Sequence, residues 1–506
     1  MTRSPSAMHH APNAIDLTHV RILSGTHLVP IPTSVAEAFR HGDRLLALPD
    51  GEVLHLPLEQ VEIAESAVTR AVEAFHSMAR VRSEAVTRFY EKFACILEDD
   101  ATWTAIEEAN QGDVQRARAT GRSTTRLEVS PKMRQAMIDG LREWRDLPSP
   151  VGQIIGTVKH PGWSVEQVVS PLGVVGFVFE GRPNVFADAT GVLRSGNTAV
   201  LRIGRDALGT ARAIVEKALD PALRESGLPV GSVALIESRE HAAGWALFSD
   251  SRVALAVARG SGPAVRQLGA IARQAGIPAS LHGKGGAWMA ADSTADPDRF
   301  YQAVYHSLDR KVCNTLNVLC LVREAAPRLV PILLKALRAR HETSHSGYRI
   351  HVTERAKAFL PVELFDTETT VHRAEGSVRE PIASMLAEDG LREEWEWERT
   401  PEISLAVAED LSEAAALVNR YSPHFVVSII SEDDKAQQQF FGATNAPFYG
   451  NGFTRWVDGQ FALNRPELGL SNWQNGRLLG RSGILSGDGI FTVRLRVRQE
   501  DAGLHR

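Results

Sequence analysis

The chain has 506 residues, and 56 Lys and Arg against 61 Asp and Glu give it a formal net charge of −5. This length exceeds what one hydrophobic core can serve, so we expect two or three domains. The acidic surplus argues against a nucleic-acid partner, and no apolar run approaches the roughly 18 residues that span a bilayer. Three cysteines, an odd number, argue against a disulfide framework and favour a reducing compartment, which predicts a cytoplasmic protein.

Residues 1–60 form a predicted N-terminal extension with a small β element. Residues 1–15 contain no apolar core, so they do not resemble a secretory signal and are expected to be frayed. A short β-type run covers 20–23. Two further runs, 45–48 and 53–56, flank a Pro-Asp-Gly turn and predict a hairpin.

The following segments change from helical to strand periodicity. Apolar residues at helical spacing over 59–145 predict two or three amphipathic helices. Residues 154–170 predict a projecting hairpin, and 490–498 alternates apolar and basic residues like an edge strand that another chain often covers. Between them, apolar runs alternate with helical stretches and predict a doubly wound α/β nucleotide-binding unit. These runs cover 174–179, 199–203, 233–236 and 253–257.

Cys313 is the cysteine best suited to chemistry. It follows Arg310 and Lys311 and precedes an apolar run. Its thiol is therefore expected to be partly exposed and held as thiolate at the mouth of a helix. The alternative is that Cys313 is a small buried hydrophobe, an interpretation that Cys95 and Cys320 fit.

The turn from Glu180 to Asn184 follows the first strand of the α/β unit. Parallel sheets bind ligands at the carboxyl ends of their strands, where this turn lies. The Asn184 amide is a candidate donor to a developing oxyanion, an interaction worth about 3 kcal/mol in a transition state. The alternative is that Asn184 caps the helix that begins at Val185.

Basic and glycine-rich turns follow the second and fourth strands. Arg202 and Arg205 are candidates for binding a cofactor ribose or its 2′-phosphate, which favours NADP, and solvated surface arginines are the alternative. The backbone N–H groups of Gly260, Ser261 and Gly262 open a helix and are candidates for binding a phosphate. A tight strand-to-helix turn needs glycine in any case.

Arg455 lies in the loop 451–456. A bidentate clamp on a substrate carboxylate is one interpretation of this arginine, and a structural ion pair is the alternative.

The order and spacing of these motifs resemble one family. Residues 171–176, 180–185 and 195–202 are similar to γ-glutamyl phosphate reductase (glutamate-5-semialdehyde dehydrogenase), a branch of the aldehyde dehydrogenase superfamily. The similarity covers about residues 62–500. Its further motifs are His282-Gly283, Val312-Cys313-Asn314, Asn419-Arg420-Tyr421 with His424, Asn451 with Thr454-Arg455, and the run from Glu467 to Ser471.

The resemblance implies an aldehyde dehydrogenase-like α/β fold with a Rossmann-type domain. After the extension over 1–60 come an NADP-binding domain over 61–279, a catalytic domain over 280–450 and a C-terminal segment over 451–506 that closes the site. The 154–170 hairpin and the C-terminal strand would form an oligomerisation flap, which implies a homo-oligomer, a dimer or a tetramer.

The resemblance also implies roles for single residues. Cys313 is the nucleophile, and Asn184 forms the oxyanion hole with the Cys313 N–H. The cofactor NADPH is held by Arg202, Arg205, Gly260, Ser261 and Gly262, and no metal is expected. Substrate binding falls to Arg182, Asn314, Asn451, Thr454 and Arg455.

Leu281 bears on the direction of the reaction. Hydrolytic aldehyde dehydrogenases, which this chain also resembles, carry a glutamate base before the glycine-rich stretch, and the matching position here is Leu281. Without a base that activates water, a thioester on Cys313 waits for hydride. The implied reaction is reduction of an acyl phosphate, γ-glutamyl phosphate or a related amino-acid acyl phosphate, to the semialdehyde. A partner kinase would supply this substrate.

Several positions depart from the family pattern around the expected substrate pocket. Asn317 stands where a glutamate is usual, Arg310-Lys311 replaces an arginine-proline pair, and Lys284, Ala287 and Trp288 are atypical. The identity of the acyl phosphate is therefore open. Two other functions also stay open: reduction of a CoA or carrier-protein thioester by the same cysteine, and a retired scaffold that binds a partner through residues 16–60.

Overall fold

The computed structural model describes residues 17, 19–122, 124, 127–179, 181–283, 285–344, 347–373, 376–397, 399–457, 462–470, 472–474, 477–478 and 483–504. Residues 1–15, Glu180, Lys284 and Ser471, which the sequence analysis names, lie outside the described residues. The chain divides into two compact units. Unit 1 comprises 1–283, 465–469 and 485–506, and unit 2 comprises 284–464 and 470–484, so the segment predicted at 451–506 is shared between them.

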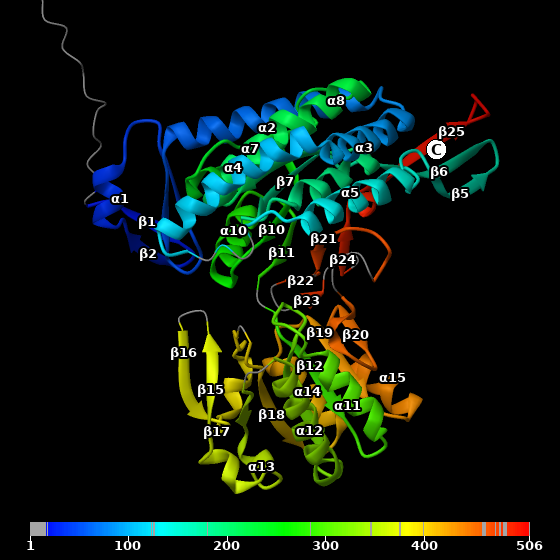
Figure 1. Ribbon diagram of the computed structural model, residues 1–506. Helices are drawn as coiled ribbons and strands as arrows, with labels where there is room; N and C mark the ends of the chain where they lie inside the picture. Colours follow the sequence, from blue (N-terminus) through cyan, green and yellow to red (C-terminus); the bar gives the residue numbers. More distant parts are fainter. Residues whose placement is uncertain are drawn as a thin grey trace, which may run out of the picture. The chain divides into compact units, whose positions relative to one another are not determined.

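Unit 1 begins with two hairpins and a short helix (Figure 1). They are β1 Arg21–Ser24 paired antiparallel with β2 His27–Pro30, α1 Thr33–Ala38, and β3 Arg44–Ala47 paired antiparallel with β4 Val53–Leu56. The hairpin predicted at 45–48 and 53–56 is thus confirmed. Leu54 and Leu56 are buried in one cluster with Val61 and Val68, so β4 belongs to the core of unit 1.

Four helices follow, where the periodicity predicted two or three. They are α2 Leu58–Met78, α3 Ser83–Glu98, α4 Asp100–Ala119 and α5 Pro131–Asp146. Asp99 separates α3 from α4, because its carboxylate accepts a hydrogen bond from the Thr102 N–H at 2.8 Å and starts a new helix. Apolar periodicity misses α4 because two of its buried positions are polar. Asn110 and Asp113 instead bond Thr210, at 3.1 and 2.7 Å.

A five-stranded sheet in the order β11-β10-β7-β8-β9 forms the centre of unit 1, and all its pairs are parallel. The strands are β7 Val174–Phe179, β8 Thr198–Ile203, β9 Val233–Leu235, β10 Val253–Arg259 and β11 Ala279–His282. The helices are α6 Val185–Ala189, α7 Leu208–Ile214, α8 Asp220–Ser226, α9 His241–Ser249 and α10 Gly262–Gln274. Phe177 belongs to the core on one face and Val178 to the core on the other. All four predicted strands and the doubly wound unit are confirmed.

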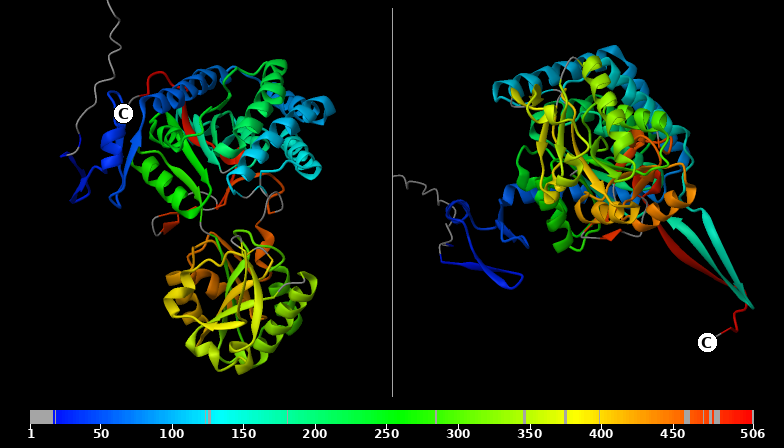
Figure 2. Two further views of the ribbon diagram at one scale, coloured as in Figure 1. Left: turned by 60° about the vertical axis from the view of Figure 1, so that its left-hand side comes forward. Right: turned by 90° about the horizontal axis from the view of Figure 1, so that it is seen from below.

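The flap of unit 1 is a three-stranded antiparallel sheet in the order β25-β6-β5. Its strands are β5 Ile154–His160, β6 Trp163–Ser170 and β25 Thr492–Gln499. In the right-hand view of Figure 2 the cyan hairpin and the red strand extend away from the helices of this unit. The predicted hairpin and the predicted pairing strand are confirmed, and their role in oligomerisation stays a prediction.

Unit 2 is built on a seven-stranded sheet in the order β17-β14-β18-β13-β12-β19-β20, in which every pair is parallel. The strands are β12 Ala287–Ala291, β13 Leu316–Val322, β14 Arg349–Val352, β17 Ala383–Met385, β18 Glu402–Ala408, β19 Val426–Ile430 and β20 Phe448–Gly450. The helices are α11 Pro297–His306, α12 Ala326–Ser344, α13 Glu354–Lys357, α14 Leu411–Tyr421 and α15 Asp434–Ala443. Since the strands run parallel, their amino ends share one edge of the sheet.

Short strands complete the described chain. They are the antiparallel hairpin β15 Glu368–Arg373 with β16 Gly376–Pro381, β21 Glu467–Leu470, β22 Trp473–Gln474, β23 Arg477–Leu478 and β24 Ile484–Ser486. Over the part of the chain that the structure describes, no helix combines the length and apolarity needed to cross a membrane.

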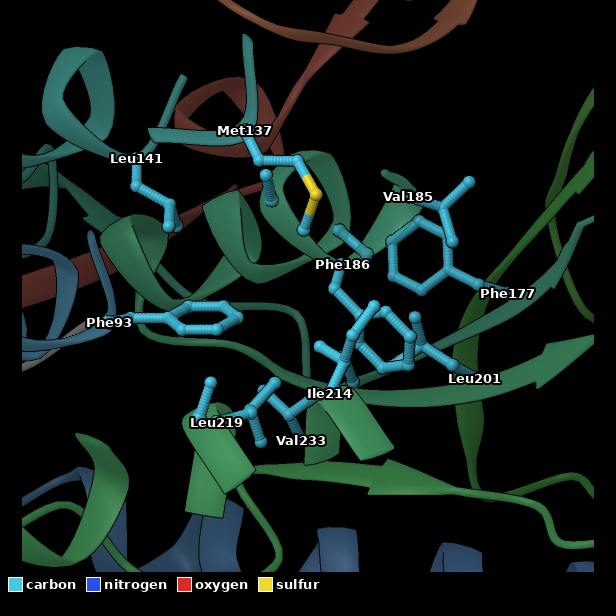
Figure 3. Close-up of a cluster of buried hydrophobic side chains, with 14 of the residues drawn as sticks. Phe93, Met137, Leu141, Phe177, Val185, Phe186, Leu201, Ile214, Leu219 and Val233 are labelled. Atoms are coloured by element: carbon cyan, nitrogen blue, oxygen red, sulfur yellow. The ribbon is translucent and has the colours of Figure 1, made fainter. Parts of the chain in front are cut away.

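A close-packed core holds the start of α6 in unit 1. Val185 and Phe186 point into the cluster that contains Phe93, Phe177 and Leu201 (Figure 3). Both residues are at most 4% exposed. This packing fixes the backbone at the start of α6. Asn184 is the residue directly before Val185.

Replacing Gly191 by Ala tests this packing. An added Cβ at Gly191 would lie 2.4 Å from the buried Trp144 ring. We expect Gly191→Ala to lower the free energy of unfolding by about 1–3 kcal/mol, as overpacked cores do. Gly112→Ala on α4 is the control, because its Cβ meets only the flexible end of Arg116 at 3.4 Å. Equal chemical-denaturation midpoints for the two variants would contradict the packing.

Candidate active site

Cys313 lies half-buried in a turn between α11 and β13, at the amino edge of the unit 2 sheet. The predicted position at the mouth of a helix is wrong. The apolar run that follows is the strand β13, buried along its whole length in a parallel sheet. Cys313 therefore keeps the predicted partial exposure without a helix dipole behind it.

The two other cysteines differ from each other. Cys320 is fully buried in β13, and burial raises the pKa of its thiol to about 12, so it is the inert core residue that was expected. Cys95 was assigned the same role, and that prediction is wrong. It is exposed on α3 and its thiol lies 3.4 Å from Glu91 Oε1, because Ala94 and Leu97 take the inward face of that helix.

Hydrogen bonds within the turn fix the backbone around Cys313. The Cys313 carbonyl accepts a bond of 2.7 Å from the Gly286 N–H. The Thr315 hydroxyl accepts from the Val312 N–H at 2.9 Å and donates to the Arg310 carbonyl at 2.7 Å. Gly285 lies so close that an added Cβ would be 2.5 Å from both Cys313 Cα and its carbonyl oxygen. Glycine at 285 is what lets the two backbones meet.

Three of the predicted substrate residues form hydrogen bonds in or next to this turn. Asn314 is fully buried, its amide donates to the Val457 carbonyl, and its side-chain oxygen accepts from Arg455 Nη1 at 2.5 Å. The Thr454 hydroxyl, also fully buried, donates to the Asn314 carbonyl at 2.7 Å. Arg455 pairs with Asp309 at 2.7 Å. The structural ion pair, the alternative interpretation of Arg455, is therefore present, and substrate binding by Asn314, Thr454 and Arg455 stays a prediction.

Arg455 also lines a cavity of about 640 Å³ in unit 2. Arg299 and Arg310 line it with Arg455, which makes its wall rich in cationic groups, and Asp309 is the one carboxylate among its lining residues. Asn451, exposed beside this loop, donates to Gln437 Oε1 at 3.2 Å, and its role in substrate binding also stays a prediction.

Lys311, two residues before Cys313, forms a largely buried ion pair. Its ammonium group pairs with Glu394 Oε1 at 2.7 Å, with only 8% and 15% of the two side chains exposed. The second oxygen of Glu394 accepts the Gly285 N–H at 2.8 Å. The ion pair thus ties the Gly285 backbone to the Cys313 turn. The positive charge expected from Lys311 is largely compensated.

Asn317, where the family has a glutamate, ties the same loop to β13. Its amide donates to the Glu393 carbonyl at 2.7 Å, and its oxygen accepts from the Trp395 N–H at 2.9 Å. Gly286 adopts φ of +101° directly against it, where an added Cβ would lie 3.1 Å from Asn317 Cβ. At position 317 the chain therefore has an amide that donates one hydrogen bond and accepts another.

In unit 1, the turns after β7 and β10 flank the point where the strand order reverses. β8 lies on one side of β7 and β10 on the other. The chain therefore passes from β7 to β8 in one direction across the sheet and from β10 to β11 in the opposite direction. Ligands of open parallel sheets bind at such a point. Asn184 and Arg182 follow β7, and Gly260 to Gly262 follow β10. The structure therefore gathers these predicted residues at one edge of the sheet.

Asn184 is half-buried and precedes α6 without capping it. Its side chain makes no hydrogen bond with any residue that the structure describes, so the alternative role as a helix cap is not the observed one. Asp188, one turn further along α6, has its pKa raised to about 6 by burial, although Arg259 and Arg182 oppose this. Burial lowers the pKa of His282, at the end of β11, to about 3, and the same two arginines add to the shift.

The turn at 260–262 is the predicted phosphate site. α10 begins at Gly262, and the Ser261 side chain accepts no capping bond. The Gly260 N–H donates to the His282 carbonyl at 3.2 Å, and Pro263 has no N–H, so phosphate binding by this turn stays a prediction. The Gly283 position lies against Gly262, where an added Cβ would be 3.2 Å from Gly262 Cα.

The two arginines after β8 have different surroundings. Arg202 is 5% exposed and donates to the Arg239 and Glu240 carbonyls at 3.3 and 3.2 Å. Its buried Nε has no partner among the described residues. Arg205 is exposed. The solvated alternative is therefore wrong for Arg202, and cofactor binding by both residues stays a prediction.

Leu281 on β11 packs into the core of unit 1. An added Cβ on Gly269 of α10 would lie 2.3 Å from Leu281 Cδ1, so the leucine side chain fills the space against that helix. An apolar contact therefore occupies position 281, where the resemblance to hydrolytic aldehyde dehydrogenases led us to look for a base.

Comparison with known proteins now adds to this geometry. A model of the aldehyde dehydrogenase family matches residues 49–345, more than half of the chain. The chain belongs to this family. It is accordingly an oxidoreductase with the predicted aldehyde dehydrogenase-like α/β fold, and the family uses a nicotinamide nucleotide, NAD or NADP.

Solved structures agree on the fold. A γ-glutamyl phosphate reductase from Thermotoga maritima shares 24% identity and a TM-score of 0.75, covering 88% of this chain and 100% of that one. An acetylating aldehyde dehydrogenase from Geobacillus thermoglucosidasius shares 14% identity and a TM-score of 0.58, covering 89% and 99%. A Rhodopseudomonas palustris propionaldehyde dehydrogenase, solved with CoA and an acylated cysteine, shares 15% identity and a TM-score of 0.57, covering 86% and 96%.

Sequence reasoning missed two residues of these sites. Glu394 belongs to no motif, and 83 residues separate it from the lysine that it binds. Asp188 carried a usable signal, because a spacing of four from Asn184 places both on one face of a helix.

Gly285→Ala tests the close approach at the nucleophile. The new Cβ would overlap the Cys313 backbone, so the turn must move. We expect the rate of Cys313 alkylation by iodoacetamide and the turnover rate to fall by about 10²-fold, because a displacement near 1 Å at a reacting group costs about that much. Gly452→Ala is the control, because its Cβ would meet nothing within 4 Å. Equal rates for the two variants would contradict the contact.

Proposed function

We propose that this protein reduces an acyl phosphate, γ-glutamyl phosphate or a related amino-acid acyl phosphate, to the semialdehyde with NADPH. The observation that carries the proposal is the packing of Leu281 against α10, where a hydrolytic enzyme of the family would hold its base. A thioester formed on the half-buried Cys313 is then protected from water until it is reduced. The likeness to the Thermotoga γ-glutamyl phosphate reductase supports the same reaction class.

The proposed reaction has two halves on one sulfur. The Cys313 Sγ attacks the carbonyl carbon of the acyl phosphate, the carbon–oxygen bond to phosphate breaks, and a thioester forms. NADPH, when bound, supplies the hydride that reduces this thioester. The thiohemiacetal on Cys313 then collapses, with cleavage of its carbon–sulfur bond, to the free aldehyde and the cysteine thiolate. The Asn184 amide and the Cys313 N–H donate to the oxyanion of both halves.

The proposal also assigns residues to the binding of cofactor and substrate. The α10 start at Gly260 to Gly262 binds a phosphate of NADPH, and Arg202 with Arg205 favours the 2′-phosphate. Arg182, Asn314, Asn451, Thr454 and Arg455 line or support the substrate position. An acyl phosphate is unstable in water, so a kinase must supply it close to this enzyme.

We also propose that the chain forms a homo-oligomer through its flap. Ile154 and Val158 on β5 and Leu495 and Val497 on β25 are 45–69% exposed. An apolar sheet surface of this kind is usually covered by another chain.

The reaction class can be tested in reverse. A panel of semialdehydes with NADP and phosphate should give NADPH with the correct aldehyde, and glutamate-5-semialdehyde is the first to try. Phosphate should be required, whereas a requirement for CoA would identify the thioester reductase, the competing function that the Geobacillus and Rhodopseudomonas likenesses raise. Cys313→Ala should abolish turnover, and a Cys313→Ala variant with unchanged activity would contradict an enzymatic role for this cysteine.

Asn184→Ala separates the oxyanion role from a structural one. Loss of one oxyanion donor should lower kcat by about 10²–10³-fold. Because the Asn184 side chain does not cap α6, the denaturation midpoint should change little, whereas loss of a real cap costs about 1 kcal/mol. A destabilised variant with normal kcat would reverse the assignment.

A further inference from the structure

A second cavity, of about 370 Å³, lies at the carboxyl edge of the unit 2 sheet. Thr353 after β14, Met385 at the end of β17 and Val407 near the end of β18 line it. Since these three strands run parallel, their carboxyl ends share one edge. Cys313 lies at the opposite, amino edge, and the length of β13 puts about 20 Å between the two edges. The cavity is therefore separate from the Cys313 turn.

The course of the chain reverses at this cavity. β14 and β18 are neighbours in the sheet. From β14 the chain passes to β17, on the side away from β18, and from β18 it passes to β19, on the side away from β14. Open parallel sheets bind ligands outside the carboxyl ends of their strands at such a point. The boundary between β14 and β18 thus has the topology of a ligand site.

Aliphatic side chains form much of the cavity wall. Leu391, Ala406 and Leu417 are buried in one core cluster, so this part of the wall is present without a ligand. Met385, by contrast, leaves 43% of its surface exposed. Among the described residues that line the cavity, none is aromatic. The wall therefore suits a ligand with an aliphatic chain.

The charged groups on the wall are mainly acidic. Glu354, Glu388 and Glu413 line the cavity, and Arg355 is the one cation among its described lining residues, so three carboxylates and one guanidinium leave a formal charge of −2. Arg355 bonds both oxygens of Glu413, at 2.8 and 2.9 Å, and lies 3.8 Å from Glu409. The Glu413 hydrogen bond first, and then the Glu409 and Glu388 charges, raise the pKa of Arg355. The single cation is therefore already compensated.

The start of α14, beside this cavity, disfavours an anion. The Asp410 carboxylate accepts from the Glu413 N–H at 2.8 Å and caps the helix. Glu413 Oε2 accepts from the Glu409 N–H at 2.7 Å. Carboxylates of the chain thus occupy the place that a bound anion would take at a helix N-terminus.

Glu388 is the carboxylate best placed to hold a cation. Its Oε1 accepts from the Tyr421 hydroxyl at 2.7 Å, and its other oxygen bonds no residue that the structure describes. Arg392 and Arg420 lie over the Tyr421 ring, at 4.9 and 5.0 Å from its centroid, and do not line the cavity. A primary ammonium group has three N–H donors for such acceptors, whereas a quaternary ammonium group is recognised by aromatic rings.

We propose that this cavity binds a primary aliphatic ammonium ion, with the chain against Leu391 and Leu417 and the ammonium group on Glu388. The volume lies near the lower end of the range for small-molecule sites, about 300–1,000 Å³, which suits a short chain. This site is additional to the reaction proposed at Cys313 and does not rest on it.

Saturation-transfer difference NMR with n-pentylamine tests the site on the full chain. The amine is protonated at about pH 7, as a lysine side chain is. We expect saturable binding in which the terminal methyl group receives the strongest saturation, because it lies among aliphatic side chains. Pentan-1-ol and pentanoate, with the same number of carbons, should bind at least about 10-fold more weakly, since they lack the charge-assisted hydrogen bond to a carboxylate.

Two substitutions locate the binding. Glu388→Gln removes the charge and keeps an acceptor for Tyr421, and it should weaken pentylammonium binding by about 10-fold. Ala387→Leu, at an exposed position on the wall, should also weaken it, because the added atoms occupy the cavity. Asp389→Asn is the matched control, because Asp389 is exposed and does not line the cavity, and it should bind as the unsubstituted protein does.

Three results would overturn the inference. One is the absence of saturable pentylammonium binding, and another is equal or tighter binding of pentanoate. The third is a Glu388→Gln or Ala387→Leu variant that binds pentylammonium as tightly as Asp389→Asn does. Thermal midpoints near that of the unsubstituted protein check that the variants are folded.

Discussion

The contact between the Gly285-Gly286 backbone and the Cys313 turn is the constraint on which the site depends. The 2.7 Å bond from the Gly286 N–H to the Cys313 carbonyl holds the turn from one side, and no Cβ fits at 285. Hydrogen bonds from the Asn314 amide to the Val457 carbonyl and from the Thr454 hydroxyl to the Asn314 carbonyl also hold this turn. A cysteine held this way has little freedom to move, so its position does not depend on a ligand.

In each unit, ion pairing or burial alters the titratable groups among the predicted site residues and their neighbours. Glu394 compensates Lys311, and burial favours the neutral forms of Asp188, His282 and His424. The cations that remain in solvent, Arg205 among them, are suited to anionic groups of a cofactor or a substrate.

Much of the fold could be predicted, because strands buried in parallel sheets need long apolar runs and hairpins need turn residues. β7, β8, β10 and the β5–β6 hairpin all carried such signals. α4 escaped because Asn110 and Asp113 are buried through hydrogen bonds to Thr210, and periodicity counts only apolar residues. The position of Cys313 before a strand was mistaken for a helix mouth, since a short apolar run is compatible with both.

For the candidate site, too, the sequence predicted some features and left others undetermined. The sequence by itself determined which residues are candidates, namely Cys313, the Asn184 motif, the glycine-rich turns and Leu281, because candidacy follows from residue type and local order. Only the tertiary structure decided which partners the side chains take. Lys311 meets Glu394, Asn314 meets Arg455, and His424 meets Trp473 across segments far apart in the chain. The direction of a side chain depends on which strands lie side by side, and strand order in a parallel sheet is set by the packing of the whole unit.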